Sequence, residues 1–158
     1  MRFAIYGLGD GMFEKDRLRP SSVLFWLAAI IALGIIFIGA RFVIDPLAGA
    51  QGFGVPADGV STFAYLWAKG ARDVVSGLLL IALLWLGVSR VILATFIYVA
   101  ALIPLADLVN VYVNTRAPGA LMIHGGTAVF MIVLASLIVW GRDTHSSNTE
   151  IEVRDRVA

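Results

Sequence analysis

Five ionisable side chains with complementary chemistry stand within apolar stretches of the sequence. Lys69 and Asp73 are four residues apart, which places them on one face of a helix, and Arg72 lies between them. Asp107 and His124 follow in two later apolar stretches. A carboxylate and an imidazole can transfer protons, whereas lysine and arginine can hold an anionic group or a developing oxyanion. These residue types suit the binding of a small molecule, with or without proton transfer.

Asp107 and His124 are therefore the candidate acid/base catalytic residues. The candidate ligand-binding residues are Arg41, Lys69, Arg72, Asp73 and Asn110. A charged side chain in the hydrocarbon of a membrane costs at least ~2.5–3.5 kcal/mol, so these groups should face inward and pair with one another. Purely structural interpretations compete with these roles: the two basic side chains can extend to lipid headgroups, and the histidine can be a hydrogen-bonded packing residue.

The composition places these residues in a membrane protein. Of 158 residues, 59% are hydrophobic and 15% are charged, and the mean hydropathy is +0.89. A soluble domain has about 45–50% apolar and about 25% charged residues. The net charge is +1 without a long basic run, so the sequence predicts no nucleic-acid partner.

Several classes of chemistry are excluded by residue counts. The absence of cysteine rules out disulfides, thiolate zinc sites, iron–sulfur clusters and thiol oxidoreductases. Two histidines, one of them in a polar tail, are too few for bis-histidine haem within one chain or a helical di-iron site. The sequence holds no GxSxG, HExxH or paired DxxD motif. We expect no metal and no cofactor.

Four long apolar stretches predict an all-α, four-helix transmembrane bundle. The predicted spans are residues 23–44, 63–88, 91–114 and 120–140. They form a transmembrane domain of residues 23–141, between a polar N-terminal segment (1–22) and a polar C-terminal tail (142–158). The first stretch is too long and too far from the N-terminus for a cleavable signal peptide. Glycine and proline predict a loop over residues 46–61, either a lid on the bundle or an interfacial linker.

Short connections predict antiparallel neighbours in an up-down bundle. The basic residues then indicate its orientation, because cytoplasmic flanks are enriched in lysine and arginine. One side has eight: Arg2, Lys15, Arg17, Arg19, Arg90, Arg142, Arg154 and Arg156. The other side has four: Arg41, Lys69, Arg72 and Arg116. Both termini are predicted to be cytoplasmic.

In this topology the polar residues of all four spans fall in one leaflet. Arg41 ends the first span, and Lys69, Arg72 and Asp73 lie in the outer half of the second. The third span carries Asp107 and Asn110 near its outer end, and the fourth carries His124 one turn inside. Pro104 leaves the carbonyl of Ala100 without a helical partner, which can bend the third span and direct Asp107 inward. The sequence predicts a polar pocket in the outer half of the bundle.

The order of short motifs between Arg41 and Trp140 resembles one protein family. The motifs are Arg41-Phe42, GFGVP at 52–56, KGARD at 69–73 with Ser76-Gly77, PLAD at 104–107 and His124-Gly125. They resemble an uncharacterised family of small four-helix integral membrane proteins from bacteria and fungi. The resemblance covers about two thirds of the chain. It implies the four-helix fold and the same polar positions, but supplies no activity.

Three functions remain open at this point. The first is a multi-pass protein of a bacterial inner membrane that binds a small, apolar or lipid-like molecule in its outer-leaflet pocket, with or without acid/base chemistry. The second is a non-enzymatic accessory subunit of a larger membrane complex. The third is a channel or proton-coupled transporter, for which the apolar inner halves provide no polar path in a single chain. The lipid bilayer is the expected partner, with a homo-oligomer or a larger complex as further possibilities.

Overall fold

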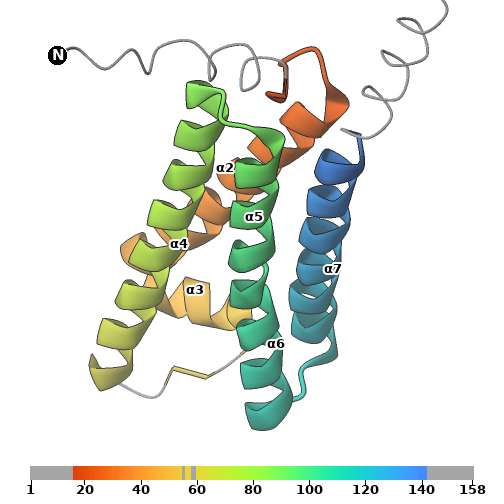
Figure 1. Cartoon of the computed structure of the whole chain (residues 1–158). Helices are drawn as coiled ribbons and strands as arrows, with labels where there is room; N and C mark the ends of the chain where they lie inside the picture. The colour runs from red at the N-terminus through yellow and green to blue at the C-terminus, as the bar shows by residue number, and fades with distance from the viewer. Residues whose placement is uncertain (1–15, 55, 58–59, 142–158) are drawn as a thin grey trace, which may run out of the picture.

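The protein is all-α in the part that the structure, a computed structural model, describes: residues 16–54, 56–57 and 60–141 (Figure 1). The helices are α2 (Val23–Ile44), α3 (Pro46–Phe53), α4 (Val60–Leu86), α5 (Arg90–Ala100), α6 (Leu102–Asn114) and α7 (Pro118–Trp140). Most of the predicted N-terminal segment and the whole predicted tail, 142–158, lie outside the described residues.

Three stretches are long and apolar enough to cross a membrane: Val23–Ile44, Arg90–Asn114 and Pro118–Trp140. Their large apolar side chains are widely exposed, as expected of helices that face lipid; Phe37 and Val133 are examples. These features indicate a multi-pass membrane protein. α4 is longer than any of the three but carries three charges in its first half, which interrupt its apolar sequence.

The tightest contact between helices is that of α2 with α4, and glycines permit it. A Cβ atom on Gly39 would lie 2.6 Å from the carbonyl oxygen of Gly70, and one on Gly77 would lie 2.7 Å from that of Ala32. Ala32 and Gly39 are seven residues apart on α2, as Gly70 and Gly77 are on α4. Such small residues at helical spacing let two backbones approach closely.

The prediction of a loop over residues 46–61 is wrong for residues 46–53, which form α3. The Asp45 side chain caps this helix by accepting from the Ala48 N–H at 3.1 Å, and Pro46 occupies the first turn, where it is tolerated. Gly54 ends the helix with φ of +85°, a conformation that glycine adopts without strain. Local capping therefore outweighs the helix-breaking tendency of the glycines.

The third predicted span is divided into α5 and α6 at Ala101. Pro104 follows one turn later and is buried, and its missing N–H leaves the Ala100 carbonyl without a partner in the helix. α6 begins at this interruption and ends at Asn114. The short turn to α7 then brings the start of α7 beside the end of α6 (Figure 1).

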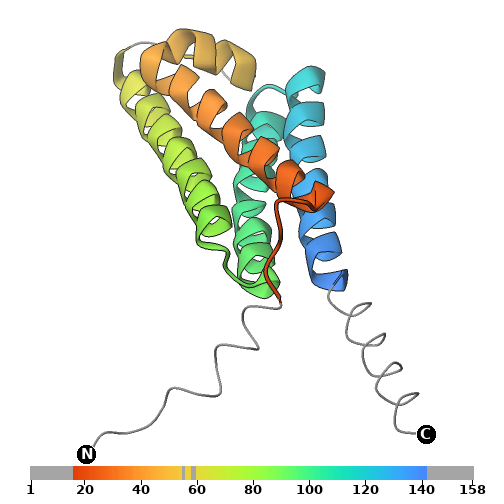
Figure 2. The same ribbon diagram turned by 90° about the horizontal axis from the view of Figure 1, so that it is seen from above.

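The two ends of the helix assembly differ in what fills them. One end contains the main apolar core, where Leu80, Ile97, Met131 and Leu134 are almost completely buried. At the other end α3 lies across the helices, and α2 and α7, which cross near the start of α2, diverge toward it (Figure 2). We call the first the apolar end and the second the charged end, because the ionisable residues of α4, α6 and α7 gather there.

Candidate functional site

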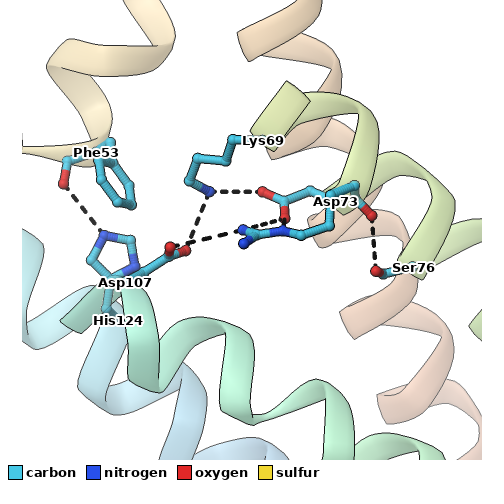
Figure 3. Close-up of polar contacts among 7 residues, drawn as sticks. Phe53, Lys69, Asp73, Ser76, Asp107 and His124 are labelled. Atoms are coloured by element: carbon cyan, nitrogen blue, oxygen red, sulfur yellow. Dashed lines mark hydrogen bonds and ion pairs between the residues drawn. The ribbon is translucent and has the colours of Figure 1, made fainter. Parts of the chain in front are cut away.

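Four charged side chains from two helices form one ion-pair network at the charged end (Figure 3). The Lys69 ammonium donates to Asp73 Oδ2 at 2.8 Å and lies 3.2 Å from Asp107 Oδ2. Arg72 donates to Asp73 Oδ1 through Nε at 3.0 Å and Nη2 at 2.9 Å. Its Nη2 also lies 3.8 Å from Asp107 Oδ1. The network joins α4 to α6, and its two positive and two negative charges balance.

Asp73 is the centre of this network and the one charged residue that is buried among those the structure describes, with 4% of its surface exposed. The close approach of α2 causes this burial, because a Cβ atom on Gly39 would come within 3.0 Å of Asp73 Cβ. A buried carboxylate is stable only with compensating partners. Lys69 and Arg72 supply three hydrogen bonds to it.

Lys69 is further enclosed by two aromatic rings. Its ammonium lies 4.7 Å from the ring centroid of Phe42 and 4.8 Å from that of Phe53, both within the range of a cation–π interaction. The two rings meet edge to face, with centroids 6.0 Å apart. Phe42 comes from α2 and Phe53 from α3, so three helices fix the position of one ammonium group.

His124 lies on α7 beside the same aromatic group. Its ring packs edge to face on Phe53 at 4.9 Å between centroids, and its Nε2 lies 3.4 Å from the Phe53 carbonyl oxygen (Figure 3). No direct bond joins His124 to Asp107 among the described contacts. The two predicted acid/base residues therefore share a region and are linked by a chain of contacts through Phe53 and Lys69.

α3 is attached to the end of α6 and the start of α7. The Thr115 hydroxyl donates to the Gly54 carbonyl at 2.6 Å, and a Cβ atom on Gly54 would lie 2.5 Å from Ala120 Cβ. Phe53, Val111 and Ala120 are buried together in a small apolar cluster. This attachment holds Phe53 over Lys69 and His124.

Two predicted ligand-binding residues lie elsewhere. Arg41 is exposed and donates through Nη2 to the Ala48 carbonyl of α3 at 3.1 Å. Asn110 is also exposed and accepts from the Asn114 amide at 2.7 Å. The structure brings neither residue into the ion-pair network, whereas it brings Lys69, Arg72, Asp73 and Asp107 into direct contact.

A cavity of about 80 Å³ adjoins the network and has a mostly apolar lining. Its lining residues are Ile35, Ile38, Lys69, Asp73, Ser76, Leu80, Phe96, Ala100, Ile103, Pro104, Asp107, Ile123, His124, Thr127 and Met131. Ile38 on α2 and Ile123 on α7 are exposed, so the cavity reaches the lipid-facing surface where these helices diverge. A cavity needs only about 10–15 Å³ to hold one water, so this space suits several waters or part of a small organic molecule.

Sequence reasoning missed three contributors to this arrangement: Phe42, Gly39 and Thr115. Phe42 lies in the last turn of α2, and nothing in the sequence indicated that its ring would cover a lysine from α4. Gly39 was detectable, because Ala32 and Gly39 repeat at the same spacing as Gly70 and Gly77. Thr115 had no such signal, since its partner, Gly54, is 61 residues away.

The described groups suit proton transfer and hydrogen bonding at the edge of an apolar space. Asp107 and His124 both line the cavity, and the ion-pair network supplies fixed charges beside them. Within the described ranges, no group of three or more His, Asp or Glu side chains has the geometry to hold a metal ion.

Comparison with known proteins gives a family but no activity. No curated protein and no solved structure matches the chain. Residues 32–138, which contain all the polar groups described above, match a domain of unknown function, DUF4267. The chain therefore belongs to the DUF4267 family.

Proposed function

We propose that this protein is a four-helix integral membrane protein whose charged end binds a small, largely apolar molecule. The observation that carries the proposal is the cavity, whose lining is mostly apolar but includes Lys69, Asp73, Asp107 and His124. Ligand sites are typically apolar spaces with a few convergent polar groups that fix orientation. The exposed Ile38 and Ile123 at its edge offer a route of entry from lipid.

In this proposal α4 crosses the membrane together with the three apolar stretches, because its charges are paired and two of its three charged side chains are largely buried. Three of the four charged side chains in the network are at most 14% exposed, and the fourth, Arg72, is 43% exposed. Pairing lowers the cost of these charges at membrane depth. The transmembrane domain is then residues 23–141, with polar segments 1–22 and 142–158 on either side.

The proposed orientation puts both termini in the cytoplasm and the charged end in the outer leaflet of a bacterial inner membrane. Basic residues favour it, with eight on the side of the termini and four on the side of α3. The connection from α4 to α5 lies at the same end of the assembly as the end of α7 (Figure 1). A Cβ atom on Gly141 would lie 2.9 Å from Arg90 Nη1.

Asp107 and His124 are the proposed acid/base residues. Both line the cavity, and neither is held as closely as Asp73. If the bound molecule is also a substrate, Asp107→Asn and His124→Gln should each reduce turnover while leaving the molecule bound. Turnover equal to that of wild type in both variants would contradict the proposed acid/base roles.

The test of the proposal is to extract bound small molecules from protein purified in mild detergent. Ala100 is 7% exposed and lines the cavity, so Ala100→Leu should fill it. Ala106, on α6, faces outward, so Ala106→Leu is the matched control. Mass spectrometry should find one compound in stoichiometric amount in wild type and in Ala106→Leu, and less of it in Ala100→Leu.

Equal amounts of every compound in the two variants would contradict a ligand site in the cavity. A stoichiometric protein partner in the same preparation, without a small molecule, would instead favour the accessory subunit.

A further inference from the structure

We propose that the polar group bound in the cavity is a neutral hydroxyl, so that the ligand is an alcohol with an apolar body. The inference rests on the proposed ligand site and adds the chemistry of the polar group. It follows from counting which hydrogen-bond donors and acceptors of the cavity wall are already used.

Lys69 has no donor left for a ligand. An ammonium group has three N–H donors. One is directed to Asp73 at 2.8 Å and another to Asp107 at 3.2 Å. The remaining side of the ammonium faces the rings of Phe42 and Phe53, 4.7 and 4.8 Å away.

An anionic group would find no free positive charge at this wall. Lys69 and Arg72 are balanced by Asp73 and Asp107, and the free side of the Arg72 guanidinium lies outside the cavity lining. A carboxylate or phosphate placed in the cavity would meet two carboxylates whose cations are already paired. The balanced network has no surplus charge of either sign, and an uncompensated charge in a site of low dielectric is costly, so the ligand should be neutral.

His124 lines the cavity and contributes a hydrogen-bond acceptor. Its Nε2 lies 3.4 Å from the Phe53 carbonyl oxygen, and a carbonyl oxygen only accepts, so Nε2 carries the proton. With the proton on Nε2, Nδ1 of the neutral imidazole is an acceptor.

The two hydroxyl groups in the lining also present acceptors. Ser76 donates to the Arg72 carbonyl at 2.8 Å, and Thr127 donates to the Ile123 carbonyl at 2.8 Å. Each hydroxyl has one proton, so what remains on each oxygen is a lone pair. Among the contacts of the described residues, Asp107 Oδ1 has the single 3.8 Å contact with Arg72, and it is a further acceptor.

The lining side chains with polar atoms therefore offer acceptors, and a ligand must bring the donor. A hydroxyl supplies one donor without charge, whereas an ether, an aldehyde or a ketone supplies only acceptors. A bound ligand would shield these acceptors from water, and leaving them then unpaired is costly, so a site of this kind discriminates strongly against an analogue without the donor.

The test uses four probes of similar size: 1-octanol, its isomer heptyl methyl ether, nonane and octanoate. The protein is placed in nanodiscs with His145→Gln, which leaves His124 as the one histidine of the sequence and allows its ring nitrogens to be followed by ¹⁵N NMR. The alcohol should shift the Nδ1 resonance saturably and bind about tenfold or more tightly than the ether, since one hydrogen bond is lost. Octanoate should bind more weakly than the alcohol.

The outcomes separate the two proposals. Saturable binding of the ether or of octanoate as tight as that of 1-octanol would overturn the hydroxyl and leave the ligand site standing. If no probe binds saturably, or if binding persists unchanged in Ala100→Leu and in the smaller filling variant Ala100→Val, both proposals fail. Preference for the alcohol that is lost in the filling variants supports both.

Discussion

The apolar end and the charged end are built from the same long helices but are held together differently. At the apolar end, side chains from α2, α4, α5 and α7 pack against one another, and Ala32, Ile97 and Ile138 have no exposed surface. At the charged end, ion pairs join α4 to α6, and α3 supplies backbone contacts to Thr115 and His124. Apolar packing holds the first end, whereas polar contacts hold the second together with a small apolar cluster of Phe53, Val111 and Ala120.

The difference follows from the divergence of α2 and α7. Where the two helices cross, apolar side chains fill the space between them, and where they diverge, a cavity remains. α3 lies across the wide end of the helix assembly (Figure 2). α2 stays close to α4 through Gly39 and Gly70, so it diverges from α7 and not from α4. A close helix contact on one side therefore leaves space for a site on the other.

The largest expected effect is at Asp73. Asp73→Ala removes the buried carboxylate that pairs with Lys69 and Arg72, which should lower the free energy of unfolding by about 3–5 kcal/mol. The measurement is unfolding in a titration with SDS. The control is Asp45→Ala, which removes an exposed cap of α3 and should cost about 1 kcal/mol. If the two variants lose equal amounts of the free energy of unfolding, the network does not stabilise the charged end.

The second largest effect is expected from a substitution at the contact of α2 with α4. Gly39→Ala would place a methyl group 2.6 Å from the Gly70 carbonyl oxygen and should cost about 1–3 kcal/mol in the same titration. Gly34 on the same helix has no atom within 4 Å of such a methyl group, so Gly34→Ala should be neutral or stabilise by up to about 1 kcal/mol. If Gly39→Ala also stabilises, the close approach is not a requirement of the fold.

A substitution in the apolar core should have a smaller effect. Leu134 is 1% exposed, and Leu134→Met keeps its volume, so the free energy of unfolding should fall by less than about 1.5 kcal/mol. Leu137→Met, on the exposed side of α7, is the control and should change little. If Leu134→Met lowers the free energy of unfolding as much as Asp73→Ala does, the two ends do not differ in the way described.

One hydroxyl contributes to the attachment of α3 beside the apolar contacts. Thr115→Val removes the bond to the Gly54 carbonyl and should cost about 1 kcal/mol, which corresponds to about fivefold faster amide exchange in α3. Thr127→Val removes a bond within α7 and should leave α3 unchanged. Unaltered exchange in Thr115→Val would show that α3 is held by its apolar contacts alone.

The sequence predicts the apolar elements better than the contacts between them. Residues 23–44 form a helix with the expected ends because apolar length and Pro46 act locally. Lys69, Arg72 and Asp73 could be grouped from their spacing, and Asp107 from the cost of an unpaired charge in lipid. Arg41 could not be separated from them, because its partner, the Ala48 carbonyl, belongs to α3, where the glycines predicted a loop. Asn110 pairs with Asn114 on its own helix, and spacing alone does not distinguish such a pair from ligand-binding residues.

The central claim is that the charged end, and not the lipid-facing surface in general, holds an apolar molecule. Photolabelling with a diazirine derivative of 1-octanol in nanodiscs, followed by peptide mass spectrometry, tests it most directly. The account predicts that adducts concentrate on cavity residues such as Ile103 and Thr127, that excess 1-octanol removes them, and that Ala100→Leu abolishes them. Adducts spread evenly over exposed residues of α2 and α7, without competition by 1-octanol, would contradict it.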